Sequence, residues 1–133
     1  MEIFKIVVLF LSGLMLSFAG MMRLITPIKA YFVKTYLENS GIKLEDDVDM
    51  LNEIRGVSAV LVLGGIIILL GTIIPEIRLT SFIVAVLIFL GFAIGRSLSL
   101  GLDGKPNQEL VQGTTAEIIF SVVNVFCLVH MLS

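Results

Sequence analysis

Six charged residues of this 133-residue chain have the types and positions needed to hold an anionic group. They are three arginines and three carboxylates near the ends of apolar stretches: Arg23, Glu53, Arg55, Arg96, Asp103 and Glu117. A guanidinium group offers parallel N–H donors, which match a carboxylate or a phosphate in two-point geometry. We therefore predict a ligand site for a lipid phosphate or for the carboxylate of an amphipathic small molecule. Arg55 and Arg96, with Arg23 nearby, would contact the anion, and Glu53 and Asp103 would orient the arginines.

Catalytic and metal chemistry find little support in the sequence. The single cysteine, Cys127, lies within an apolar run, and the single histidine, His130, has no neighbouring cysteine or carboxylate. No serine stands at a useful spacing from a base, and no phosphate-binding loop is present. We expect no enzymatic activity, no metal and no cofactor. The net charge of -2 also gives no reason to expect a nucleic-acid partner.

The amino-acid composition indicates that the chain is a membrane protein. Hydrophobic residues make up 57% of the chain and charged residues 15%, whereas soluble domains have about 45–50% and about 25%. Residues 3–22, 56–74, 79–100 and 115–132 are each long and apolar enough to cross a bilayer, and in hydrocarbon such runs must be helical. We predict an all-α membrane protein, one domain over residues 1–133, built as a bundle of four transmembrane helices. The first run is long for a secretory signal, so we expect it to remain as a span.

The connection between the first two spans has helical patterns of its own. Thr26 followed by Pro27 is a typical helix start, and an amphipathic helix over about residues 27–39 is predicted to lie in the membrane interface. Alternatively, it packs across the end of the bundle. Beyond it, apolar spacing predicts one long helix from Asp47 to Ile74 that projects past the hydrocarbon and ends at Pro75.

Four spans place both termini on one side of the membrane and residues 23–55 and 101–114 on the other. Most of the lysines and arginines fall on this second side, so the positive-inside rule predicts that the long loops are cytoplasmic. The same topology brings the six charged residues to one depth. Charges within spans usually face the bundle interior and pair there.

Helix geometry narrows the expected pairs. Glu53 and Arg55 are two residues apart and point to opposite sides of their helix, so each needs a partner from another helix. We expect Arg96 to pair with Glu53 or Glu117. The Gly91–Gly95 spacing just before Arg96 would let a neighbouring helix approach closely. Other glycines (Gly13, Gly20, Gly64, Gly65 and Gly71) are expected to serve as packing contacts.

Each of these charges also has a simpler explanation. Glu117 stands three residues after Thr114, which is the spacing of a helix capping box. Glu53 would face water on projecting turns, and Arg96 would extend to the lipid headgroups. The turn sequence that begins at Asp103 is expected to fold its loop back over the charged cluster.

The segments "LNEIRG" and "GRSLSLGLDGKP" carry a resemblance to a known family. Together with the glycine-rich second span, they resemble small four-span bacterial membrane proteins grouped as domain of unknown function 4345. The resemblance implies a bacterial inner-membrane location and the same helix layout, but no activity. Besides lipid binding, the alternative role is a structural or accessory subunit, with the charges as a staple between helices and with a membrane protein or a second copy as partner.

Overall fold

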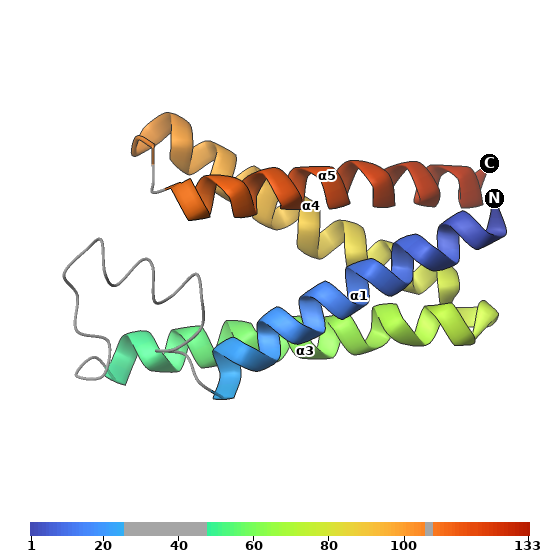
Figure 1. Cartoon of the computed structure of the whole chain (residues 1–133), viewed down its shortest axis with the longest axis horizontal. Coiled ribbons are helices and arrows are strands. Elements are labelled where there is room, and N and C mark those ends of the chain that lie inside the picture. The colour runs from blue at the N-terminus through green and yellow to red at the C-terminus, as the bar shows by residue number, and fades with distance from the viewer. Residues whose placement is uncertain (26–47, 106–107) are drawn as a thin grey trace.

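Four long helices make up the computed structural model, which describes residues 1–25, 48–105 and 108–133 (Figure 1). They are α1 (Glu2–Ile25), α3 (Val48–Ile73), α4 (Arg78–Leu102) and α5 (Gln108–Leu132), and the 3₁₀ turn η2 (Pro75–Ile77) joins α3 to α4. The described residues contain no strand. Each helix holds a segment long and apolar enough to cross a membrane, which confirms the predicted all-α bundle of four spans. The interfacial helix predicted for residues 27–39 lies outside the described residues.

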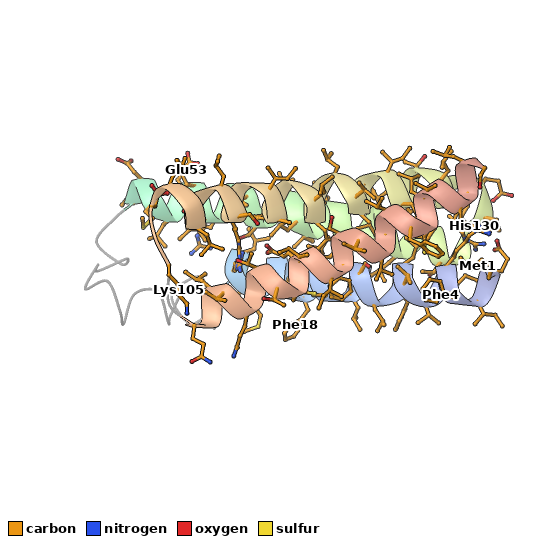
Figure 2. The ribbon with its side chains drawn as sticks, turned by 90° about the horizontal axis from the view of Figure 1, so that it is seen from above. Met1, Phe4, Phe18, Glu53, Lys105 and His130 are labelled. Carbon is orange, nitrogen blue, oxygen red and sulfur yellow. The ribbon has the colours of Figure 1, made fainter. Side chains whose placement is uncertain are left out.

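The outer surface of the bundle is apolar along the spans. Phe18, Leu87 and Val122, on three different helices, are 66%, 71% and 63% exposed, and Phe18 projects outward in Figure 2. A soluble monomer rarely exposes apolar patches of this extent. The surface is therefore suited to lipid, and the chain is a small membrane-embedded protein.

The two ends of the bundle are distinct. Both termini lie at one end (Figure 1), where Figure 2 shows Met1 and His130, whereas Glu53 and Lys105 lie at the opposite end. We call these the terminal end and the loop end. This arrangement agrees with the prediction that the termini share one side of the membrane.

Glycines bring α1 and α3 into close contact. A Cβ atom built on Gly20 would lie 2.9 Å from the carbonyl oxygen of Ser58, and one built on Gly65 would lie 2.8 Å from the backbone nitrogen of Ser17. Near the terminal end, Gly71 of α3 allows the same approach to Ser81 of α4. These contacts confirm that the isolated glycines pack helices together.

The close helix crossing predicted at Gly91 and Gly95 is wrong for the described residues. Both glycines are exposed, and a Cβ atom at either would meet nothing within 4 Å. The reason is the direction of α4, which contacts α3 at Gly71 and Gly64 and leaves it toward the loop end (Figure 1). The two glycines therefore lie where the helices have already separated.

The helix α5 begins earlier than its apolar run. Polar residues from Gln108 onward continue the helix toward the loop end, so it starts well before residue 115. Thr114 is consequently inside the helix, where its hydroxyl donates to the carbonyl oxygen of Leu110 at 2.9 Å. The capping-box explanation of Glu117 is therefore wrong, because Thr114 does not begin the helix. At the other boundary, α3 ends at Ile73 and Pro75 opens the turn, as predicted.

Candidate functional site

Three of the six predicted charged residues line one cavity near the loop end. Arg23 comes from α1, Arg96 from α4 and Glu117 from α5. The cavity has a volume of about 150 Å³, and all four helices contribute to its walls. Apart from Gln112 and the three charged side chains, its lining is apolar or glycine: Met15, Leu16, Ala19, Leu61, Phe89, Phe92, Gly113 and Ala116. The structure thus collects these charges in a largely apolar enclosure.

Arg96 and Glu117 form an ion pair between α4 and α5. The Nε atom of Arg96 lies 3.4 Å from Oε2 of Glu117, with the side chains 24% and 13% exposed. The guanidinium carbon also lies 5.4 Å from the ring centroid of Phe92, a favourable cation–π arrangement. Glu117 was one of the two partners expected for Arg96, and that expectation is confirmed.

The ion pair leaves hydrogen-bonding capacity unused. Oε2 of Glu117 is buried and has no hydrogen-bond partner among the described residues. Within the same part of the chain, no residue accepts a hydrogen bond from the Nη atoms of Arg96. A buried polar group without a partner is costly. Oε2 of Glu117 can accept a hydrogen bond from a donor, such as a water molecule, whereas the Nη atoms of Arg96 can donate to an acceptor, such as an anion.

Arg23 adds a second positive charge to the cavity. It interacts electrostatically with both neighbours, attractively with Glu117 and repulsively with Arg96. The residues that line the cavity therefore carry two guanidinium groups and one carboxylate. Guanidinium groups beside a largely apolar cavity can donate hydrogen bonds to an anionic ligand.

The other three predicted residues lie outside this cavity, so the expectation that all six meet is wrong. Arg55 is exposed, and its Nη1 donates to the carbonyl oxygen of Leu24 at 2.6 Å, near the C-terminal end of α1. A cation there satisfies a terminal carbonyl and complements the helix dipole. Arg55 thus positions a helix end and does not line the pocket.

Glu53 and Asp103 do not orient the arginines of the cavity. Glu53 is exposed on the first turns of α3, which agrees with the simpler explanation that it faces water there. Asp103 is exposed and accepts a hydrogen bond from the hydroxyl of Ser99 at 2.9 Å. It lies two helical turns beyond Arg96, and Gly104 then turns the chain with a φ of 101°.

Sequence reasoning missed a second charged cluster, at the terminal end. Arg78 is 8% exposed. It donates to the carbonyl oxygens of Gly71 at 2.9 Å and Thr72 at 3.4 Å, and to Oε2 of Glu2 at 2.8 Å. Lys5 is also buried and lies 3.8 Å from the same carboxylate.

A buried polar contact in the middle of the bundle was also missed. Nδ2 of Asn124 donates to the hydroxyl of Ser12 at 3.0 Å and to the carbonyl oxygen of Phe120 at 2.8 Å. Asn124 and Ser12 are fully buried and connect α5 to α1. The signal was present, because an asparagine within an apolar run usually has a partner on another helix.

Metal ligands do not gather in the described parts of the chain. No three histidine, cysteine, aspartate or glutamate residues there could hold an ion together. Cys127 is fully buried and His130 is exposed at the terminal end. The arrangement that stands out chemically is therefore the cavity of Arg23, Arg96 and Glu117.

The comparison with family models identifies the chain. Residues 3–128 match the family described as Domain of unknown function (DUF4345), which covers nearly the whole sequence. The chain belongs to this family, as its two motifs had suggested. Neither the curated proteins nor the solved structures gave a match.

Proposed function

We propose that this member of the DUF4345 family binds the anionic head of a membrane-resident amphiphile in the cavity of Arg23, Arg96 and Glu117. The observation that carries the proposal is the guanidinium group of Arg96, which lies beside Glu117 in a largely apolar cavity and donates no hydrogen bond from its Nη atoms within the described residues. An anion would accept hydrogen bonds from these Nη atoms.

The size of the cavity limits what its charged part accepts. A volume of about 150 Å³ is close to that of engineered cavities that hold a benzene molecule. A carboxylate or a phosphate with its first carbon atoms fits this space, whereas a large polar headgroup does not. The rest of the ligand must therefore extend out of the cavity into the apolar part of the bilayer.

The same proposal includes the location of the protein. We place it in the bacterial inner membrane with the loop end toward the cytoplasm. The support is the excess of lysine and arginine in the segments of the loop side, which the positive-inside rule assigns to the cytoplasm. Alkaline phosphatase fused after Ser133 should then be active outside the cytoplasm, and an inactive fusion would reverse the orientation.

Replacing Glu117 tests anion binding, because this substitution is expected to raise the affinity for an anion. In Glu117→Gln the carboxylate that competes for the arginines is gone, so binding of an anion should become tighter. At an effective dielectric constant of about 20 and a separation of about 7 Å, removing one negative charge contributes about 2 kcal/mol, or more than about tenfold in affinity. Calorimetric titration in a non-ionic detergent would measure this with two probes of equal chain length, laurate and dodecyl phosphate.

Two further variants complete the experiment. Arg23→Gln should weaken binding of both probes, since it removes a positive charge from the lining of the cavity. Glu53→Gln is the matched control for Glu117→Gln, because Glu53 is an exposed glutamate outside the cavity. Failure of the wild-type protein to bind either probe would refute the proposal, as would equal affinities of the Glu117→Gln variant and the control.

The second candidate is a structural or accessory subunit. The observation that favours it is the ion pair between Arg96 and Glu117, which joins α4 to α5. The open face at Gly91 and Gly95 would then contact another membrane protein or a second copy. Under this alternative, Glu117→Gln lowers the free energy of unfolding and leaves the affinity for laurate unchanged.

A further inference from the structure

We propose that the cavity binds its anion together with one proton, which Glu117 takes up from water. This inference rests on the proposed function, because it assumes that an anion occupies the cavity beside Arg96. It adds a dependence of binding on pH and identifies the group that causes it. Three features of the cavity and a polar route to its carboxyl group support the inference.

The first feature is that the anion and Glu117 depend on the same guanidinium group. Nε of Arg96 lies 3.4 Å from Oε2 of Glu117. The Nη atoms, which have no acceptor among the described residues, belong to the same planar group. An anion bound to them therefore brings a second negative charge close to the carboxylate. Two negative charges that share one site disfavour each other, and a carboxylate relieves this repulsion when it takes up a proton.

The size of this coupling follows from the separation of the charges. At an effective dielectric constant of about 20 and a separation of about 7 Å, the repulsion changes proton binding by more than about tenfold. The coupling between two ligands of one protein is reciprocal. The protonated form of Glu117 should therefore bind the anion more tightly than the ionised form by the same factor.

The second feature is the burial of the carboxylate. The Glu117 side chain is 13% exposed, and its Oε2 has no hydrogen-bond partner in the described part of the chain. In this largely apolar site the carboxylate depends on its cationic neighbours, and a bound anion competes for Arg96. A protonated carboxyl group carries no charge. Its O–H can also donate a hydrogen bond to the anion, which a carboxylate cannot do.

The third feature is the set of titratable groups around this carboxyl group. Arg96 faces the cavity from α4 and Arg23 from α1, whereas Leu61 is the residue that α3 contributes to the described lining. Arginine side chains stay protonated in proteins. Among the described lining residues, Glu117 is therefore the group whose charge can change with pH.

A polar route connects the cavity to water at the loop end. Gln112 is exposed and lines both the cavity and a neighbouring hollow. Lys105, Gln108 and Thr115 also line this hollow, and Lys105 marks the loop end in Figure 2. Water that enters beside Gln112 can deliver the proton to Glu117, and the proton returns by the same route when the anion leaves.

Calorimetric titration with octanesulfonate measures the proton directly, because the sulfonate group of this single-chain probe stays ionised at every pH used. The protein in a non-ionic detergent is titrated at about pH 7.5 in bis-tris and in Tris, at equal chloride concentration. The acids of both buffers are cations, which do not compete for the arginines, and their heats of ionisation differ. The difference in binding heat gives the number of protons taken up. We expect between one half and one proton per bound probe, and an affinity that falls by up to about tenfold per pH unit as the pH rises.

Two variants assign the proton to its group. Glu117→Gln should take up no proton and should bind octanesulfonate with an affinity that does not change with pH. Glu53→Gln is the matched control, because this exposed glutamate lies outside the cavity, and it should take up the proton as the wild-type protein does. Unchanged proton uptake in Glu117→Gln would overturn the inference.

Infrared difference spectroscopy of the wild-type protein gives a second measurement, which does not depend on the folding of a variant. Binding should produce the carbonyl band of a protonated carboxyl group and remove a carboxylate band, since octanesulfonate contributes neither. Binding without this band, or without proton uptake in the calorimeter, would overturn the inference and leave the proposed function intact. Failure of the wild-type protein to bind octanesulfonate, laurate or dodecyl phosphate would instead refute the proposed function itself.

Discussion

Exchanging single glycines for alanine tests the helix packing of the bundle, because similar glycines stand in opposite environments. At Gly65 the added methyl group would lie 2.8 Å from the backbone nitrogen of Ser17 and 3.1 Å from the carbonyl oxygen of Gly13. Ordinary contacts of a Cβ atom are 3.4–4 Å. Both neighbours are backbone atoms of α1 and cannot rotate away. The helices α1 and α3 must therefore move apart.

The expected free energies follow from these distances. Overpacking a tight interface costs about 1–3 kcal/mol, so Gly65→Ala should lower the free energy of unfolding by that amount. At Gly91 nothing lies within 4 Å of the new methyl group, and alanine is preferred to glycine within a helix by about 0.5–1 kcal/mol. Gly91→Ala should thus be neutral or stabilising. Because both glycines lie within helices, the preference for alanine applies to both and cancels, so the two variants should differ by the overpacking cost of about 1–3 kcal/mol.

Unfolding by sodium dodecyl sulfate, followed by circular dichroism in mixed micelles, would measure this difference. Gly64→Ala is an intermediate case for comparison, because its added methyl group would meet the end of the Ile88 side chain, which can move more easily than backbone atoms. Its loss of stability should lie between those of Gly65→Ala and Gly91→Ala. Equal effects at Gly65 and Gly91, or the reverse order, would refute the assigned crossing of α1 and α3.

Two further substitutions test the polar contacts that the sequence did not reveal. Arg78→Met should lower the free energy of unfolding by about 2–4 kcal/mol, since a charged donor contributes roughly 1.5–3 kcal/mol per hydrogen bond. Glu2→Gln should lower the free energy of unfolding by less than about 1 kcal/mol, because the Glu2 side chain is 66% exposed. Both are measured in the same denaturant titration, and equal losses would contradict the assignment of the buried bonds to Arg78. Asn124→Leu should change stability by less than about 1 kcal/mol, since interhelical hydrogen bonds in membranes are weak on average and Oδ1 of Asn124 has no partner in the described chain. A larger loss would show that its bond to Ser12 holds α5 in place.

The sequence predicts the number of helices and which helix ends share one side of the membrane, because a chain in lipid can adopt few kinds of structure. Long apolar runs must form helices in hydrocarbon, and four of them return the chain to its starting side. The same reasoning predicted that Arg96 and Glu117 reach one depth, and their ion pair is observed. The early start of α3 followed from apolar spacing ahead of the span, since Val48 and Leu51 continue the pattern of the helix.

The rotation of each helix about its own axis could not be predicted, and most of the errors follow from this. The run from Val57 to Ile73 in α3 is apolar on every side, so the sequence does not indicate which glycines face α1 and which face α4. The Gly91–Gly95 spacing was therefore assigned to a crossing that Gly65 and Gly71 make instead. Depth alone also grouped Arg55 with the cavity, although its side chain points to the end of α1.

A comparison of Arg78 with the partly buried Arg96 explains why one end of the bundle is the candidate site and the other is not. At the terminal end, Nε and both Nη atoms of Arg78 donate to acceptors of the chain itself. Such a cation is already satisfied and has no capacity for a ligand. At the loop end, Arg96 has a carboxylate at 3.4 Å and an aromatic ring, and its Nη atoms donate no hydrogen bond within the described residues. Burial of a charge is thus not enough to identify a site; unmet hydrogen-bonding capacity beside a cavity is the stronger sign, because a ligand can stabilise only what the fold leaves unsatisfied.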